Sequence, residues 1–344
     1  MNALHKAAPG PGAVYGPVDA PRLGDDELLI KVHRASICGS DLPIYHWTSW
    51  APQRVKVPMV FGHEFCGSVE KAGKAVKEFK KGDFVSVESH IYCGECRQCL
   101  EGRQNVCRSM KIIGVDGPGG FGDYAVIPAR CAWKHRGEKL KDLGSLMEPF
   151  GNAVYSVNVE PVAGACVLVT GCGPQGLFAV AVAKASGANR VVAVEGSSYR
   201  AKLARALGAD AVIAPADSRA LDEALKAGDC PDGFDVVCEM SGAPAAIALA
   251  MKSVRSGGRV TAFGIPPKNI ELDWANELIF KGVRIYGIVG REVFKTWEET
   301  DRLLNGPVDI SSVVTHTFPL KDFKKGFAVM SAPEKECGKV IFVP

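Results

Sequence analysis

Four cysteines lie close together in the segment CGECRQCLEGRQNVC, residues 93–107. The spacing C-x2-C-x2-C-x7-C is compatible with a zinc ion, an iron–sulfur cluster or a pair of disulfides. Ferredoxin-type clusters have a final spacing of three residues followed by proline, whereas seven residues and then Arg108 stand here. In a reducing compartment such a cluster is more often a metal site than a set of disulfides. We therefore expect a structural zinc ion bound by Cys93, Cys96, Cys99 and Cys107.

Two shorter motifs, ICGSD at residues 37–41 and FGHEF at residues 61–65, contain a second candidate metal site. Their thiolate, imidazole and carboxylate groups belong to Cys38, His63 and Glu64. Three such ligands can bind zinc and leave a fourth position for substrate or water. From spacing alone this signal is weak, because each of the three residues is more often structural than ligating. A nucleotide-binding motif further along the chain strengthens the metal interpretation.

That motif is GCGPQG at residues 171–176, which fits the G-x-G-x-x-G pattern of dinucleotide-binding turns. It follows the apolar run 165–170 and opens a segment of helical composition, and Glu195 stands 19 positions after its last glycine. The glycines would let a pyrophosphate approach the positive end of the helix, while Glu195 would accept hydrogen bonds from ribose hydroxyls. An acidic residue there repels a 2′-phosphate, which favours NAD over NADP. The three glycines are Gly171, Gly173 and Gly176.

Composition restricts the class of protein. The 344 residues, 47% hydrophobic and 23% charged, suit a globular chain of about two domains. The net charge of +3 comes from interleaved signs, so neither nucleic acid nor a membrane surface is the expected partner. We find no apolar run of about 18 residues and no signal-peptide core, and therefore expect a cytoplasmic protein.

The order of predicted elements indicates an α/β protein. Short alternating segments at 26–34, 85–88 and 124–127 predict a mostly β region over about the first 150 residues. After residue 161, apolar strands alternate with helical stretches, which predicts a doubly wound parallel sheet. The expected strands cover residues 165–170, 191–194, 234–238, 259–263 and 283–288, with a helix over 177–184.

Beyond residue 290 this alternation stops, and residues 339–343 predict one last strand that packs on the first domain. The predicted division is a catalytic domain over 1–150, a nucleotide-binding domain over 151–290 and a returning segment over 291–344.

Taken together, these motifs resemble the zinc-dependent medium-chain dehydrogenases and, within them, the threonine dehydrogenase family. The resemblance covers essentially the whole chain and includes EPFGNAV at residues 148–154 and GREVFKTW at residues 290–297. It implies a GroES-like catalytic domain, a Rossmann domain, assembly as a homotetramer, NAD as cofactor and two zinc ions per chain, one catalytic and one structural.

The resemblance also implies roles for single residues. Cys38, His63 and Glu64 would surround the catalytic zinc. Glu148 would lie near it as a labile ligand or a proton-handling carboxylate, and Ser40 would take the proton of the alcohol. The remaining implied cofactor contacts are Gln175, Glu195, Arg200, Phe263, Gly264, Ile265, Ile288 and Val289.

The implied reaction is the oxidation of a secondary alcohol. Zinc as a Lewis acid lowers the pKa of the hydroxyl, and a hydride passes to the nicotinamide of NAD. For L-threonine the product would be 2-amino-3-oxobutanoate. The alternative is a related dehydrogenase acting on a polyol, a cyclitol or another amino alcohol. A non-catalytic NAD-binding sensor would not need an open metal site.

Two positions depart from the family pattern, in which a threonine at position 40 and a histidine at position 43 relay the proton. Ser40 keeps the hydroxyl, but Pro43 cannot carry a proton. His46 is the only imidazole nearby, so it either replaces the missing histidine or is a surface residue beside Trp47. For Arg291, the open alternatives are attraction of a substrate or cofactor anion and an ion pair in the neighbourhood of Glu292.

Overall fold

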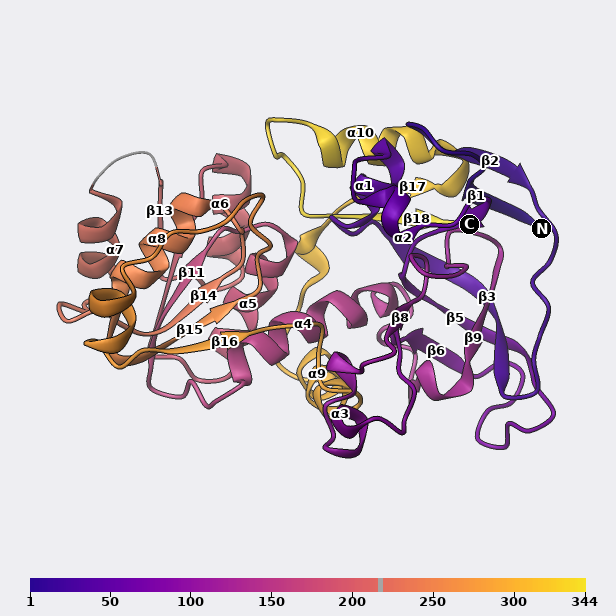
Figure 1. Cartoon of the computed structure of the whole chain (residues 1–344), viewed down its shortest axis with the longest axis horizontal. Coiled ribbons are helices and arrows are strands. Elements are labelled where there is room, and N and C mark those ends of the chain that lie inside the picture. Colours follow the sequence, from indigo (N-terminus) through magenta and orange to yellow (C-terminus); the bar gives the residue numbers. More distant parts are fainter. Residues whose placement is uncertain (216–218) are drawn as a thin grey trace.

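The computed structural model describes residues 1–215 and 219–344. It has a β-rich half, which contains both ends of the chain, and a half built around a parallel sheet (Figure 1). Helices α4 (Met147–Asn158) and α9 (Lys295–Asn305) lie between the halves and pack against each other. Among the described residues, no helix combines the length and the apolar character that crossing a membrane requires.

The β-rich half is organised around a seven-stranded sheet in the order β10-β6-β5-β3-β18-β17, with β9 paired to β3. Its strands are β3 (Glu27–Ser36), β5 (Glu64–Ala72), β6 (Phe84–Val87), β9 (Tyr124–Pro128), β10 (Ala132–Lys134), β17 (Val314–Pro319) and β18 (Lys339–Val343). The strands predicted at 26–34, 85–88, 124–127 and 339–343 correspond to β3, β6, β9 and β18. β17 was not expected. It lies parallel to β18, which pairs antiparallel with β3.

Shorter elements complete this half. A three-stranded sheet has the order β2-β1-β4, and β7 pairs with β8 beside the four-cysteine segment. The bounds are β1 (Asn2–Lys6), β2 (Val14–Pro17), β4 (Met59–Val60), β7 (His90–Ile91), β8 (Lys111–Ile112), α1 (Asp41–His46), α2 (Ala51–Arg54), α3 (Arg97–Leu100) and α10 (Phe323–Ser331).

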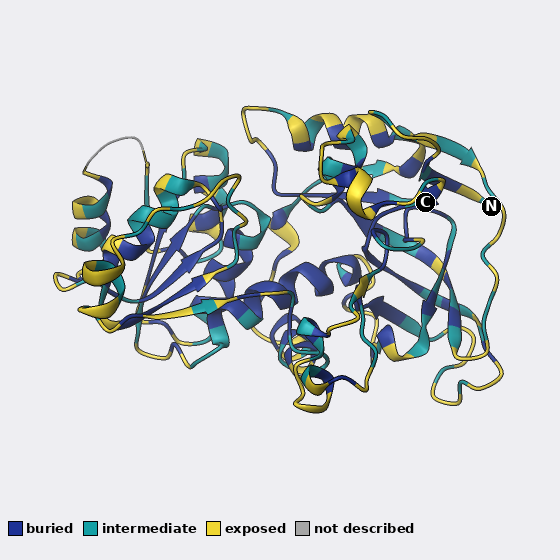
Figure 2. Ribbon diagram, in the orientation of Figure 1, coloured by how far each residue is buried: buried dark blue, intermediate teal, exposed yellow. Residues whose placement is uncertain are grey.

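Strand β3 shows why the sequence pattern gives this sheet. Its apolar residues Leu28, Ile30 and Val32 alternate with more exposed residues and are buried. They pack in one core with Phe65 of β5 and Phe342 of β18. Because side chains in a strand point alternately to opposite faces, this spacing places one apolar face of β3 inside. The buried strand interiors are visible in Figure 2.

The other half contains a six-stranded parallel sheet in the order β13-β12-β11-β14-β15-β16. Its elements are β11 (Cys166–Thr170), α5 (Pro174–Ala185), β12 (Arg190–Val194), α6 (Ser198–Ala206), β13 (Ala211–Ile213), α7 (Ala220–Gly228), β14 (Phe234–Glu239), α8 (Pro244–Ser253), β15 (Val254–Ala262) and β16 (Arg284–Gly287). After β11 the chain forms β12 and β13 on one side of that strand, and it then crosses to form β14 on the other side. The glycine-rich turn therefore follows the strand at which the order reverses, the place where such sheets bind dinucleotides.

Helices cover both faces of this sheet, which is why its strands are apolar throughout. Val167 and Val169 of β11 pack in the core that α4 and α5 share, whereas Leu168 packs on the opposite side with residues of α7 and α8. The α/β class with a doubly wound parallel sheet is therefore confirmed.

The segments that join the two halves share a core with the parallel sheet. Trp297 and Leu303 of α9 are fully buried in the same cluster as Phe150 of α4. Helix α4 spans the first predicted domain limit, and the second falls just before α9. The limits near residues 150 and 290 stay predictions.

Candidate active site and metal centres

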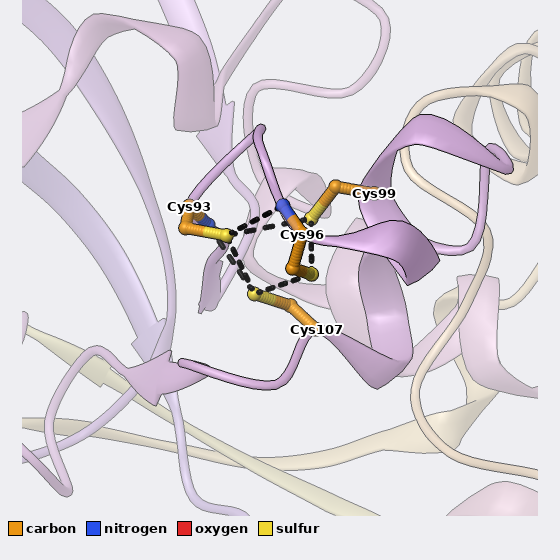
Figure 3. A group of neighbouring side chains, drawn as sticks. All are labelled: Cys93, Cys96, Cys99 and Cys107. Carbon is orange, nitrogen blue, oxygen red and sulfur yellow. Dashed lines mark hydrogen bonds between the residues drawn. The ribbon is translucent and has the colours of Figure 1, made fainter.

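The four cysteine sulfurs of residues 93–107 face one another (Figure 3). Sγ of Cys96 lies 3.5 Å from that of Cys99 and 3.8 Å from that of Cys107, and Cys93 lies 3.5 Å from Cys107 and 4.0 Å from Cys99. A disulfide needs about 2.05 Å. Zinc–sulfur bonds of about 2.3 Å in a tetrahedron put the sulfurs about 3.8 Å apart. The donor set and its spacing therefore fit zinc.

Backbone N–H groups also point at these sulfurs. The amide of Cys96 lies 3.4 Å from Sγ of Cys93, and the amides of Cys93 and Ser109 lie 3.3 Å and 3.4 Å from Sγ of Cys107. Such contacts stabilise thiolates, the form that binds metal. The segment is thus shaped to hold four thiolates around one ion.

The second candidate metal site forms where β3 and β5 meet. Ser36 at the end of β3 is the register partner of Glu64 at the start of β5, so the residues just beyond them are brought together. One ligand atom each of Cys38, His63 and Glu64 lie within 4.8 Å of one another. His63 and Glu64 are buried, and Cys38 is partly exposed. The structure therefore brings together the three residues that the two separate motifs supplied.

The polar atoms of this group fit a cation. Oε1 of Glu64 is buried without a hydrogen-bond partner in the described part of the chain. The Oδ1 atom of buried Asp41 lies 3.6 Å from Nδ1 of His63, and Oδ2 accepts from the backbone N–H of Cys38 at 2.8 Å. At 3.6 Å these two atoms are not hydrogen-bonded, but the carboxylate charge near Nδ1 favours a proton on Nδ1 and leaves Nε2 to bind metal. Ser40 lies on the same side, with Oγ 3.4 Å from Nε2 of His63.

A lysine from the end of the chain completes the surroundings of Glu64. Oε2 of Glu64 accepts hydrogen bonds from Nζ of Lys339 and from Oγ of Ser36, and all three residues are buried. One carboxylate oxygen of Glu64 is therefore engaged, while Oε1 has no hydrogen-bond partner in the described part of the chain. Sequence reasoning missed Lys339, although a lysine that begins an apolar strand requires a partner when the strand is buried.

Glu148 lies in a buried ionic network. Its Oε1 accepts from Nη2 of Arg291 at 2.8 Å and from Oγ of Ser89 at 2.6 Å. Arg291 also makes two hydrogen bonds to Glu88, from Nη2 to Oε1 at 2.7 Å and from Nε to Oε2 at 2.8 Å. Trp297 donates to Oε2 of Glu88 at 2.7 Å. Although burial opposes it, Arg291 and His90 hold the pKa of Glu88 well below its usual range.

The fully buried Arg291 corrects one of the alternatives drawn from the sequence. Within the described part of the chain its ion-pair partners are Glu88 and Glu148, whereas Glu292 pairs with Lys295. Its partners Glu88 and Glu148 lie 203 and 143 positions earlier in the chain. Local sequence could not reveal them, since the contact depends on how the two halves are joined.

The glycine-rich turn has the geometry that its glycines require. Gly171 has φ +85°, and a Cβ there would lie 2.6 Å from Cβ of Ser241. A Cβ on Gly176 would lie 1.8 Å from the backbone oxygen of Gly171. Glu195 is bonded directly to this turn, because its Oε2 accepts a hydrogen bond of 2.6 Å from the backbone N–H of Cys172. The acidic residue and the turn are therefore held in one unit.

The other expected cofactor residues lie at the carboxyl ends of the strands or in nearby segments. Phe263, Gly264 and Ile265 follow β15, and Ile288 with Val289 follows β16; Ile265 and Val289 are 89% and 50% exposed. Oε1 of Gln175 is buried without a partner among the residues that the structure describes. Arg200 donates from Nε to the backbone oxygen of Cys337 at 2.8 Å, so in this structure it contacts the returning segment.

The side chain of His46 contacts helix α10, close to the end of the chain. It is exposed on α1, and Nε2 lies 3.0 Å from Oγ of Ser331 on α10. Ser40 is itself exposed. No hydrogen bond between His46 and Ser40 is present among the described residues.

Comparisons with known proteins agree with this geometry. Residues 24–137 match the alcohol dehydrogenase GroES-like domain, and residues 174–306 match the zinc-binding dehydrogenase family. L-threonine 3-dehydrogenases of Bacillus velezensis and Bacillus licheniformis are 44% and 45% identical to the chain, and 100% of this chain and 99% of each relative are covered. A solved alcohol dehydrogenase from E. coli CFT073, complexed with NADH, has a TM-score of 0.91 at 26% identity, covering 100% of this chain and 99% of that one.

The chain therefore belongs to the zinc-dependent medium-chain alcohol dehydrogenases. Within that family it is similar over its whole length to L-threonine 3-dehydrogenases. The expected combination of a GroES-like β-rich domain with a Rossmann domain is confirmed, as is the prediction that the protein is a dehydrogenase.

Proposed function

We propose that the protein oxidises the secondary alcohol of L-threonine with NAD, giving 2-amino-3-oxobutanoate and NADH. The observation that carries this proposal is the convergence of Cys38, His63 and Glu64, with one buried carboxylate oxygen left unpartnered among the described residues. The full-length similarity to L-threonine 3-dehydrogenases supports the choice of substrate.

The chain's own residues would act on the alcohol as follows. A zinc ion held by Cys38, His63 and Glu64 would supply Lewis acidity, which would lower the pKa of the substrate hydroxyl. Ser40, whose Oγ lies 3.4 Å from Nε2 of His63, accepts the proton that leaves this hydroxyl. Because Ser40 is exposed, it can pass the proton directly to water. The charge of Asp41 near Nδ1 of His63 would favour the tautomer that leaves Nε2 to the metal.

Glu148 would serve as a charged neighbour of this site. Arg291 and Ser89 occupy its Oε1 atom, and its charge acts on His63. A carboxylate with one oxygen fixed in this way can offer the other to a metal ligand position or to a proton. We propose this role for Glu148 in the catalytic site.

NAD would bind across the carboxyl end of the parallel sheet. The pyrophosphate would contact the turn formed by Gly171, Gly173, Gln175 and Gly176. Glu195 would accept hydrogen bonds from the ribose hydroxyls of the adenosine. The negative charge of Glu195 disfavours a 2′-phosphate, so we propose NAD and not NADP. The residues proposed to line the rest of the cofactor are Arg200, Phe263, Gly264, Ile265, Ile288 and Val289.

One observation keeps a second substrate class open. Pro43 stands where the family carries a relay histidine, and the segment around it lies beside the proposed catalytic Ser40. A changed residue at this position alters the surface that meets the substrate. The alternative is therefore another secondary alcohol, namely a polyol, a cyclitol or a different amino alcohol, oxidised by the same machinery.

We also propose that the chain acts as a homotetramer. Strand β16 is one of the two outer strands of the parallel sheet, and Ile285 on it is 42% exposed. Nearby segments expose Trp274 at 61% and Phe280 at 78%. An unpaired strand edge with exposed apolar side chains favours association with another chain.

A zinc site made of four thiolates suits a reducing compartment, and we propose the cytoplasm.

The deciding experiment measures initial rates of NAD reduction by the zinc-loaded protein with L-threonine and with a panel of polyols, cyclitols and amino alcohols. A kcat/KM for L-threonine well above that of the panel supports the proposal. A higher value for another alcohol retains the mechanism and assigns the second substrate class. Metal analysis of the same preparation is expected to give two zinc ions per chain, and a single ion would contradict the catalytic site.

A further inference from the structure

Asn105 connects the four-cysteine segment to the loop that follows β16. It lies in the short helical turn Gln104–Val106, directly before the last two residues of the segment. Its side chain is buried, and Nδ2 donates a hydrogen bond of 2.7 Å to the backbone oxygen of Val289, 184 positions later in the chain. A buried amide that bonds so distant a loop fixes that loop against the metal-binding segment.

The loop is also held from its other side. Gly290 has φ +55°, and a Cβ added to it would lie 2.5 Å from Cε1 of His90, so the ring packs directly on the glycine backbone. The next residue, Arg291, is fixed by two hydrogen bonds to Glu88. Three consecutive residues are therefore held through their backbone or a buried side chain, while Val289 as a whole residue is 50% exposed.

We infer that Asn105 is a positioning residue for the nicotinamide end of the cofactor, an inference that rests on the NAD binding proposed above. A dinucleotide bound to this sheet begins with its adenosine near Glu195 and extends across the carboxyl ends of the strands toward β15 and β16. The loop after β16 then borders the far end of the cofactor. By holding the Val289 carbonyl toward the metal-binding segment, Asn105 fixes which face of the loop is presented to the nicotinamide.

The four-cysteine segment thereby gains a second task. It stabilises the fold and, through the bond from Asn105 to Val289, fixes the loop that borders the nicotinamide. Substitution of Asn105 leaves the Val289 carbonyl without its donor and frees the loop. The affinity for a ligand that needs the ordered loop should fall about tenfold, or about 1.4 kcal/mol, which is within the range that one buried hydrogen bond contributes.

Two ligands separate positioning from general stability. NADH carries the nicotinamide, whereas ADP-ribose carries only the adenosine, the pyrophosphate and the second ribose. Dissociation constants for both are measured on the zinc-loaded full chain, by fluorescence titration for NADH and by calorimetry for ADP-ribose. The variants are Asn105→Asp, which keeps the shape but removes the donor, and Asn105→Ala. The control is Glu101→Gln, a surface residue of the same segment that pairs with Arg97.

The expected result is NADH binding about tenfold weaker in both Asn105 variants, ADP-ribose binding within about twofold of the unsubstituted protein, and no change for either ligand in Glu101→Gln. Unchanged NADH binding overturns the inference. Equal weakening for both ligands also overturns it, because Asn105 would then only stabilise the fold. Absence of NADH binding by the unsubstituted protein would instead overturn the proposed NAD-dependent function.

Discussion

Nη2 of Arg291 lies 2.8 Å from Oε1 of Glu148, and the guanidinium is completely buried. The same guanidinium makes two hydrogen bonds to Glu88. One arginine thus compensates two buried carboxylates, one of which we propose for the catalytic site. It stands at the beginning of the returning segment, so this ionic contact also joins that segment to the β-rich half.

We predict that Arg291→Met destabilises the protein by about 3 to 5 kcal/mol, because removing one partner of a buried ionic network leaves uncompensated charge. Urea unfolding at pH 7.5 measures this loss. Lys295→Met is the control, since its ion pair with Glu292 lies on the surface, with 80% of the lysine side chain exposed. Equal stabilities of the two variants would show that Glu88 and Glu148 find other partners.

The two metal sites predict opposite outcomes for two cysteine substitutions. Cys107→Ser should reduce the zinc content from two ions to one per chain and lower the melting temperature, because the segment loses one of its four thiolates. Cys38→Ser should also reduce the zinc content, but with little loss of stability and with loss of activity. Zinc analysis, thermal unfolding and rates on the same samples test this. A Cys107→Ser protein that is fully stable but inactive would contradict the assignment.

Each predicted element has a pattern in its own local sequence. The missed contacts instead join residues that lie far apart in the sequence. Strand β18 at Lys339–Val343 was predicted from an apolar run, and the glycine turn from its spacing. The bond between Lys339 and Glu64 spans 275 positions and exists because β18 inserts beside β3. Arg291 follows the same rule. Sequence periodicity specifies which residues are buried in one element, but the element that covers them is decided by the tertiary fold.

His135 predicts a defined pH dependence of stability. Burial lowers the pKa of its imidazole to about 4. Asp301, whose Oδ1 lies 3.9 Å from Nδ1, raises this pKa by less than burial lowers it. Between pH 6.5 and 4 the unfolded chain therefore binds a proton at this residue that the folded chain does not. Stability contributed by neutral His135 is complete above pH 6.5 and is lost as the pH falls toward 4.

From these pKa values, the folded protein should lose about 2 kcal/mol between pH 7.5 and 5 through this residue alone. The measurement compares urea unfolding of the unsubstituted protein and His135→Asn at both pH values, so that the titration of other groups cancels. The stability of the unsubstituted protein is expected to fall more steeply on acidification than that of the variant. Parallel decreases would show that His135 is accessible to protons in the folded state.

The last prediction concerns the route of the alcohol proton. Ser40→Ala should lower kcat by about a hundredfold or more, in the range of lost general acid–base catalysis, because Oγ beside His63 is the proposed acceptor. His46→Ala should leave kcat and its pH profile unchanged, because Nε2 of His46 is directed to Ser331 on α10. Stopped-flow rates of NADH formation across pH 6 to 10 measure both effects. If His46→Ala shifts the pH profile while Ser331→Ala does not, the proton reaches solvent through His46, and direct transfer from Ser40 to water is wrong.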